Sequence, residues 1–236
     1  IAAYPGSGRD CVMGALSDKY FELEALSDER RFTITSTAAH TMYEKSDPYS
    51  LPGPGGTLDL SDTFFETVHE GRIRVSGTRF IPALPYTVKL EGVKSTGFRT
   101  ISIGGVRDPI LIKSIDSVLD DVRKLVQDEL GDNGKLIFHI YGKNGVMGKL
   151  EPERDRLSHE LGIVIEVVTP DQEQSDFICS YVRSALLHTG YPGRISTAGN
   201  LALLYSPSDI SCGEVHEFNI YHLMTVDDPE CLFPIH

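Results

Sequence analysis

Residues 98–130, FRTISIGGVRDPILIKSIDSVLDDVRKLVQDEL, decide the fold class because they place a strand, a turn and a long helix in succession. We expect the strand over residues 98–103. Asp108 can cap the helix, Pro109 suits its first position, and Gly131 comes just past its end. Apolar residues then recur at helical spacing, which predicts a helix with one buried stripe against a sheet: Leu111, Ile115, Val118, Val122, Leu125 and Val126.

The same scheme recurs on both sides of this stretch. Before it we expect strands over residues 63–69, 72–76 and 86–93, the last with Val88 and Leu90 on one face. After it come strands over 135–141 and 161–168, a second helix that starts at the capping box 169–172 and stops at Gly190, and strands over 201–205 and 215–223. The order ββαββαββ predicts an α+β, two-layer sandwich, a largely antiparallel sheet with two main helices on one face.

The first 56 residues differ in character from the rest. They read as an irregular N-terminal segment with one helix over 37–45, capped by Ser36. The run 51–56, LPGPGG, is a strong break, so we expect a boundary there and an α+β domain over 57–236. Because Ile1 is not a methionine and residues 3–9 resemble an internal loop, we also expect a fragment or processed chain.

Composition narrows the class of partner. The 236 residues carry a formal net charge of -12, with 22 Lys and Arg against 34 Asp and Glu, which disfavours nucleic acid and anionic membrane surfaces. No apolar run approaches the roughly 18 residues of a membrane span, and no signal peptide opens the chain, so we expect a cytoplasmic protein. The four cysteines form no CxxC pair, and Cys179 is expected as a buried thiol on a helix.

Three polar segments are candidate anion sites. In the loop 141–148, glycines surround Lys143 and Asn144, a composition that suits a phosphate or carboxylate but is equally typical of an exposed turn. Arg107 precedes a helix N-terminus, where it can clamp an anion. The loop 187–200 brings Arg194, Thr197 and Asn200, either for binding or as a structural connector. The glycine-rich residues 5–9 are a weaker candidate.

Proton-handling groups are sparse. Lys89 and Glu91 share one face of a strand and are candidates for proton transfer, although such pairs are often only solvated partners. His159 is a second catalytic candidate. A metal site built from His159, Glu166, His216 or His222 is a weaker alternative, since no zinc-binding motif is present and no metal site is expected.

The chain resembles the second half of acyclic terpene utilisation (AtuA-type) proteins. The resemblance runs in order from about residue 20 to residue 224, through residues 20–24, 38–45, 51–56, 86–92, 107–112, 141–148, 159–162, 190–200, 206–209 and 217–224. It implies a role in degrading acyclic isoprenoids such as citronellol and geraniol through carboxylate and CoA-thioester intermediates. The family's glycine-rich first half has no counterpart here.

We therefore expect a catabolic enzyme subunit or fragment that acts on an acyl or CoA-thioester substrate, without a cofactor other than CoA carried by the substrate. Arg107, Lys143 and Arg194 would then surround one pocket. The rival is a non-catalytic packing or oligomerisation domain that contacts the missing half or a homologous subunit, and a homo-oligomer is expected. A metal-dependent hydrolase is the third alternative.

Overall fold

The computed structural model describes residues 11–27, 31–43, 45–130, 134–197 and 199–234. The chain divides into two compact units: unit 1 holds residues 1–91 and 221–236, and unit 2 holds Gly92–Ile220. The boundary expected at Gly56 lies inside a hairpin, because β3 (Ser50–Gly53) pairs with β4 (Gly56–Asp59) across it. The loop of residues 5–9 lies outside the described residues.

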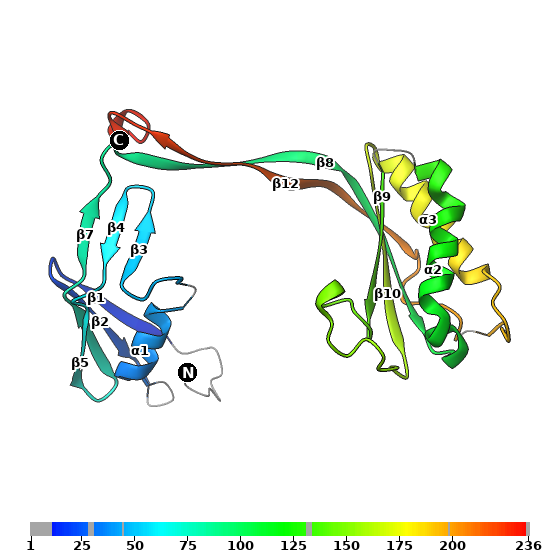
Figure 1. Ribbon diagram of the computed structural model, residues 1–236, viewed down its shortest axis with the longest axis horizontal. Coiled ribbons are helices and arrows are strands. Elements are labelled where there is room, and N and C mark those ends of the chain that lie inside the picture. Colours follow the sequence, from blue (N-terminus) through cyan, green and yellow to red (C-terminus); the bar gives the residue numbers. More distant parts are fainter. Residues whose placement is uncertain (1–10, 28–30, 44, 131–133, 198, 235–236) are drawn as a thin grey trace. The chain divides into compact units, whose positions relative to one another are not determined.

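Within its described residues, unit 1 contains two small antiparallel sheets, one α-helix and a short 3-10 helix, Pro229–Cys231 (Figure 1). The first sheet has the order β1 (Val12–Leu16), β2 (Tyr20–Ala25), β6 (Arg72–Ser76), β5 (Phe64–His69). The second has the order β3, β4, β7 (Arg79–Pro82). Strands thus occupy much of the segment that we expected to be irregular. β2 alternates apolar residues with Glu22 and Glu24, a strand pattern that was not recognised from the sequence.

The helix α1 spans Ile34–Thr41, earlier than the expected 37–45. Thr33 is its cap, since the Thr33 hydroxyl accepts a hydrogen bond from the Ser36 backbone N–H at 3.0 Å. The Ser36 hydroxyl in turn accepts one from the Thr33 N–H at 3.0 Å. Ser36 is therefore the third residue of a capping box rather than the cap.

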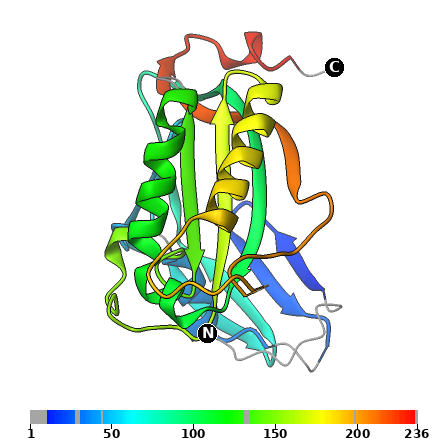
Figure 2. The ribbon, with the colours of Figure 1, turned by 90° about the vertical axis from the view of Figure 1, so that its right-hand side faces the viewer.

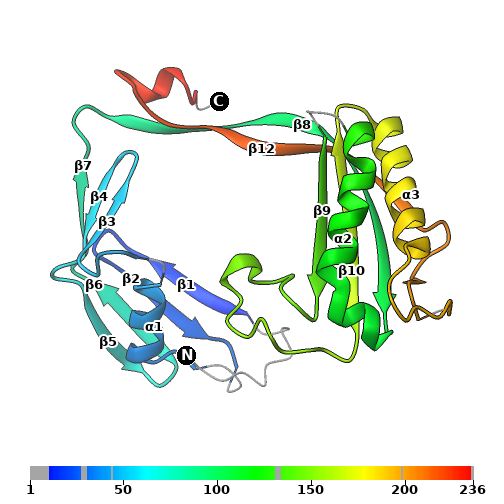
Figure 3. The ribbon, with the colours of Figure 1, turned by 45° about the vertical axis from the view of Figure 1, so that its right-hand side comes forward.

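Unit 2 is the two-layer sandwich that the sequence predicts. Its sheet has the order β11 (Ala202–Leu203), β8 (Thr87–Val106), β10 (Leu161–Thr169), β9 (Lys135–Tyr141), all antiparallel, and β12 (Asp209–Thr225) also pairs with β8. The helices α2 (Pro109–Leu130) and α3 (Gln172–His188) lie side by side over one face of this sheet (Figures 2 and 3). The predicted α+β class and the placement of both helices on one face are confirmed.

The core of unit 2 lies between the sheet and these helices. Ile115 and Val122 of α2 and Ile178 of α3 are at most 1% exposed, as are Ile163 and Val167 of β10. Burying each of these side chains stabilises the fold by roughly 1.5–3 kcal/mol. Among the described helices, none is long and apolar enough to cross a membrane.

The strand β8 differs from the sequence-based expectation. Strands expected over 86–93 and 98–103 form one element of 20 residues, with Gly97 inside it at φ +127°. A Cβ on Gly97 would lie 2.4 Å from the carbonyl oxygen of Thr169, so this glycine permits a close approach instead of ending the strand. Its first residues belong to unit 1 and the remainder to unit 2.

Candidate functional site

Unit 2 presents one face of its sheet that α2 and α3 do not cover, and we call it the open face. Strand alternation and register assign four residues from each of the three strands to it: Arg99, Ile101, Ile103 and Gly105 of β8, Gly162, Val164, Glu166 and Val168 of β10, and Lys135, Ile137, His139 and Tyr141 of β9. Most of these side chains are apolar. Three of the polar ones, Arg99, Glu166 and His139, contact one another.

Glu166 sits at the centre of a charged triad on the open face. Its Oε2 lies 2.6 Å from Nε2 of His139, and its Oε1 accepts a hydrogen bond from Nε of Arg99 at 2.6 Å. The Glu166 side chain is only 13% exposed, and this burial by itself favours the neutral acid. The hydrogen bonds from His139 and Arg99 outweigh burial and lower the pKa of Glu166, so the group is a carboxylate near neutral pH.

An ionised Glu166 fixes the form of the histidine. A carboxylate only accepts hydrogen bonds, so Nε2 of His139 must carry the proton that points to it. The other ring nitrogen, Nδ1, is then a free acceptor when the ring is neutral, and no bond to it occurs within the described part of the chain. Since the His139 side chain is 39% exposed, Nδ1 is available to take a proton from a bound molecule.

An apolar hollow of about 350 Å³ lies at one end of the open face. It is lined by Ile103, Gly104, Gly105, Val106, Arg107, Glu160, Gly162, Gly199, Ala202 and Leu204. Gly105 and Gly162 face each other across the strand pair β8–β10, and Tyr141 of β9 is opposite Gly162. His139 is two residues before Tyr141 on the same face, which is roughly 7 Å along the strand.

Of the four glycines that line this hollow, Gly105 and Gly162 are not required by the backbone. A Cβ on Gly105 would meet nothing closer than 4.0 Å, and one on Gly162 would lie 3.7 Å from Cβ of Tyr141, both ordinary contacts. Neither has a positive φ. Gly104 differs, since its Cβ would lie 2.6 Å from Cδ1 of the buried Leu201. Gly105 and Gly162 therefore leave space on the open face, whereas Gly104 serves packing.

Arg107 lies at the rim of the hollow, where β8 passes into α2. Its Nη1 donates to the carbonyl oxygen of His159 at 2.7 Å, and its backbone N–H donates to the carbonyl oxygen of Gly199 at 2.9 Å. His159, a predicted catalytic residue, is exposed and contacts Arg107 through its main-chain carbonyl oxygen. Arg107 thus ties the segment before β10 and the loop before β11 to the start of α2.

Asn200 belongs to a polar cluster behind this rim. Asp108 caps α2 by accepting from the Ile110 N–H at 2.8 Å, and its other oxygen accepts from the Tyr191 hydroxyl at 2.5 Å. Asn200, which is 3% exposed, donates to the Tyr191 oxygen at 2.6 Å. Burial, together with the bond to the Asp108 carboxylate, raises the pKa of Tyr191 to about 12. The bond from Tyr191 is the main cause of the lowered pKa of Asp108.

Arg194 supports the loop that follows α3. Its Nη2 donates to the carbonyl oxygen of Leu187 at 3.0 Å. Its Nε is buried and has no acceptor among the described residues. In these contacts Arg194 binds its own loop.

Lys143 and Asn144 follow β9 on the side of the sheet that carries α2. Nζ of Lys143 lies 2.5 Å from Oδ2 of Asp116 on α2, and Lys143 lines a second, basic hollow. The Asn144 N–H donates to the Ile140 carbonyl oxygen at 3.2 Å, and its own carbonyl oxygen accepts from Gly148 at 2.8 Å. Arg107 and Lys143 therefore line two different hollows.

Lys89 and Glu91 form the predicted pair, in unit 1. Nζ of Lys89 lies 2.6 Å from Oε1 of Glu91 and 4.5 Å from the centre of the Tyr221 ring. The hydrogen bond with Glu91 is the main reason that the pKa of Lys89 is raised, which favours the cationic form of this lysine. Both Lys89 and Tyr221 line a hollow of about 310 Å³ that also contains residues 52–54 and 222–223.

The residues of the metal alternative lie in different surroundings. Glu166 is bound by Arg99 and His139, and His216 lies 3.9 Å from Glu214. In the described ranges, three or more His, Cys, Asp or Glu residues nowhere group as metal ligands. Cys179 is fully buried, and this burial raises the pKa of its thiol to about 12, which fits the expected structural role.

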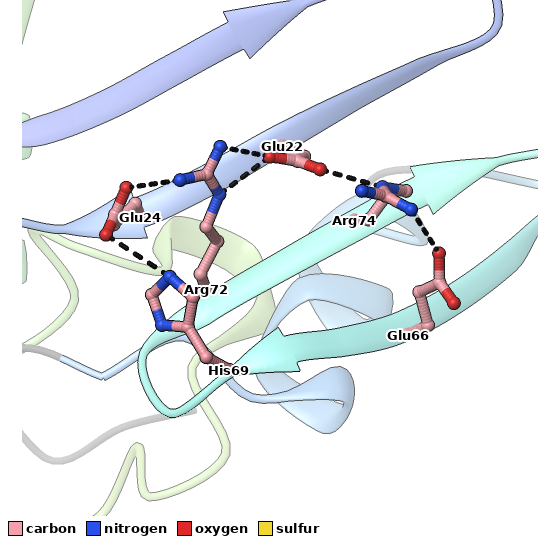
Figure 4. Close-up of polar contacts among 6 residues, drawn as sticks. All are labelled: Glu22, Glu24, Glu66, His69, Arg72 and Arg74. Carbon is pink, nitrogen blue, oxygen red and sulfur yellow. Dashed lines mark hydrogen bonds and ion pairs between the residues drawn. The ribbon is translucent and has the colours of Figure 1, made fainter.

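A network of ion pairs covers one face of the first sheet in unit 1 (Figure 4). Glu22, 4% exposed, lies between Arg72 and Arg74 and contacts both guanidinium groups. The network continues from Arg72 to Glu24 at 3.0 Å and from Arg74 to Glu66 at 3.1 Å. Each arginine thus bridges two carboxylates, so these charges neutralise one another and the network stabilises the sheet.

A hollow of about 690 Å³ lies beside α3 in unit 2. Arg183 bridges both carboxylate oxygens of Asp209 at 2.8 and 2.9 Å. Oδ1 of Asp176 accepts hydrogen bonds from Thr100, Gln172 and Ser211. The charged groups at this hollow are therefore already satisfied by neighbouring side chains.

His139, Gly105 and Gly162 were not predicted as site residues. His139 is a lone histidine in a strand, and its partner Glu166 is 27 positions away in the sequence. Only the register of β9 with β10 brings them together. Strand alternation could have indicated this site, because it places His139 and Glu166 on the face of their strands that points away from the helices.

The family model described as acyclic terpene utilisation family protein AtuA matches residues 28–204. No curated protein and no solved structure matches the chain.

Proposed function

This chain belongs to the acyclic terpene utilisation (AtuA) family, and from that membership we propose that unit 2 binds an acyl intermediate of acyclic terpene breakdown on its open face. Such an intermediate is a branched apolar chain that ends in a carboxylate or thioester. The apolar hollow over Gly105 and Gly162 takes the branched chain. His139 removes or returns a proton next to the acyl group.

The observation that carries this proposal is the pair of glycines beside an oriented histidine. Gly105 and Gly162 have space for a side chain and present none, which leaves about 350 Å³ free above an apolar floor. Ligand sites are commonly apolar hollows with a few placed polar groups. The charged groups that line the hollow are Arg107 and Glu160. His139, oriented by Glu166, lies on the same face two residues before Tyr141, the strand partner of Gly162.

The chemistry is a proton transfer. Nδ1 of neutral His139 takes a proton from the carbon next to the acyl group, the C–H bond breaks and an N–H bond forms, and the electron pair is delocalised into the acyl group. Glu166 stabilises the imidazolium that results, because its carboxylate already binds Nε2–H. Return of the proton restores both partners.

Binding and proton transfer are tested separately on the full chain. Isothermal titration with geranate, an acyclic terpene acid, is expected to show binding that Gly105→Leu weakens by about tenfold or more, because the leucine fills the hollow. The matched control is Val93→Leu, an exposed position of β8 outside the open face. Equal binding by the wild type and Gly105→Leu would refute the site.

Deuterium exchange at the carbon next to the thioester of citronellyl-CoA, where that carbon is saturated, is followed by NMR and tests the role of His139. The exchange should be lost in His139→Asn and reduced in Glu166→Gln, while geranate binding is kept. Exchange that persists in His139→Asn would exclude this residue as the base. Lys89, Glu91 and His159 remain predicted alternatives, and Glu91→Gln and His159→Asn complete the series.

A packing role for the open face is the second candidate, because Ile137 and Tyr141 on it are 40% and 52% exposed. A second copy of the chain would cover these residues in the expected homo-oligomer. Light scattering of the wild type and Ile137→Lys separates the two functions. A dimer that the lysine dissociates would favour packing, whereas a monomer that still binds geranate would favour the ligand site.

A further inference from the structure

The basic hollow between α2 and the loop after β9 has a lining unlike the rest of this acidic chain. Its lining contains four cations and, among the described residues, no carboxylate: Ile112, Lys113, Gly142, Lys143, Arg154, Arg156, Leu157, Ser158 and Leu161. The whole chain has a net charge of -12. Four cations around one hollow therefore concentrate positive potential where the average field is negative.

Two of these cations have no carboxylate partner within the described residues. The guanidinium of Arg154 donates to main-chain carbonyl oxygens, those of Glu151 at 3.1 Å and of Lys149. Lys113 makes no ion pair in the same part of the chain. The other two are paired, Lys143 with Asp116 and Arg156 with Glu153. The hollow thus holds about two uncompensated positive charges.

Main-chain hydrogen bonds occupy the amides of the loop after β9, so its side chains, and not these amides, are available to a ligand in the hollow. The N–H groups of Lys143, Asn144 and Gly145 all donate to the carbonyl oxygen of Ile140. The Ser158 hydroxyl donates to the Gly142 carbonyl oxygen and holds the two sides of the loop together. An anion in this hollow would be bound by ammonium and guanidinium groups.

The size of the hollow limits what enters it. Its volume is about 30 Å³, close to the space of one water molecule in the liquid. It therefore admits the oxygen end of an anion and leaves the rest of the ligand outside. Two uncompensated cations match a dianionic phosphate better than a singly charged carboxylate.

We propose that this hollow is a phosphate subsite, formed by Lys113, Lys143, Arg154 and Arg156. It borders on the same segment, residues 157–162, as the apolar hollow: Leu157, Ser158 and Leu161 line the basic hollow, and Glu160 and Gly162 line the apolar one. A single ligand with a phosphate at one end and an acyl chain at the other could reach both. This inference rests on the proposed function only for the identity of the acyl end.

The test is a titration of the full chain with inorganic phosphate, followed by ³¹P NMR, in parallel with acetate. Phosphate should bind, and the Lys113→Ala/Arg154→Ala double variant should weaken binding by about tenfold or more. The matched control is Lys124→Ala, since Lys124 lies on the same helix, is 78% exposed and pairs with Asp121. A rise in salt concentration should weaken phosphate binding in the wild type.

The possible outcomes separate this subsite from the acyl site. Loss of phosphate binding in the double variant, with geranate binding and the control unchanged, supports the subsite. Equal weakening by Lys124→Ala would show a general effect of charge and overturn it, as would wild-type binding by the double variant or equal binding of acetate. The result with geranate tests the acyl site on its own.

Discussion

Two adjacent glycines of β8 should respond in opposite ways to the same substitution. Gly105 lies on the open face, where a Cβ would meet nothing closer than 4.0 Å. Gly104 faces the helices, where a Cβ would lie 2.6 Å from Cδ1 of Leu201, a side chain that is 5% exposed. Alanine at Gly105 should therefore stabilise the protein, and alanine at Gly104 should destabilise it.

The magnitudes follow from these contacts. An unstrained Gly→Ala change lowers the entropy of the unfolded chain and stabilises by about 0.4–1 kcal/mol. For a chain of this size, 1 kcal/mol corresponds to about 2–4 °C in Tm, so Gly105→Ala should raise Tm by about 1–4 °C. An overpacked core costs about 1–3 kcal/mol, so Gly104→Ala should lower Tm by about 2–12 °C.

Calorimetry of the two variants beside the wild type measures both shifts. The same samples are then titrated with geranate, for which Gly105→Ala should bind more weakly than the wild type because its methyl group enters the apolar hollow. A destabilised Gly105→Ala would show that the fold requires this glycine, and the argument that it exists to leave space would fail. An unchanged Tm in Gly104→Ala would refute the packing assigned to Leu201.

Three further predictions concern titrating groups. Because the pKa of Glu166 is lowered from its ordinary 4.5, its carboxylate stabilises the protein above that pH, and this contribution is lost as the pH falls. Urea unfolding should therefore show that Glu166→Gln loses less stability than the wild type between about pH 7 and pH 3. An equal loss in the two proteins would contradict the contacts assigned to Glu166. The pKa of Tyr191 is raised to about 12, so its contribution to stability is complete below about pH 10 and is lost as the pH rises through 12. At about pH 11, Tyr191→Phe should leave the tyrosinate absorbance almost unchanged, and a clear fall in absorbance would contradict the raised pKa. Cys179 is buried with a pKa of about 12, so Ellman's reagent should titrate the three exposed thiols quickly and Cys179 only after unfolding, and fast reaction of all four would contradict its burial.

The fold of unit 2 could be predicted because its signals are local. Asp108 and Pro109 mark the start of α2, and the apolar stripe that follows has the period of a helix. In unit 1, β5 and β6 were predicted, whereas β1, β2, β3, β4 and β7, whose structure depends on long-range partners, were missed. β2 alternates apolar residues with Glu22 and Glu24, and only the register with β6 brings Arg72 and Arg74 beside these carboxylates.

The candidate site was less predictable for the same reason. Arg107 was predicted from its place before a helix, and it does lie at the rim of the apolar hollow. The dyad of His139 and Glu166 depends on the register of β9 with β10, which no local pattern specifies. The space over Gly105 and Gly162 depends on the register of β8 with β10. In a sequence, a glycine within a strand suggests that the strand ends there, and only the paired strands show that it continues.

The division of the chain into units has a consequence for synthesis on the ribosome. Unit 2 is one continuous stretch, Gly92–Ile220, whereas unit 1 needs Tyr221 and the residues after it in addition to its first 91. The ribosome adds about 5–20 residues per second, so the 129 residues of unit 2 separate the two parts of unit 1 by about 6–26 s. During that interval the nascent chain contains only the first part of unit 1, so unit 2 can fold before the synthesis of unit 1 is complete. Pulse-labelling of stalled nascent chains would therefore find protection in α2 and α3 before β8 acquires its partner β12 in unit 1.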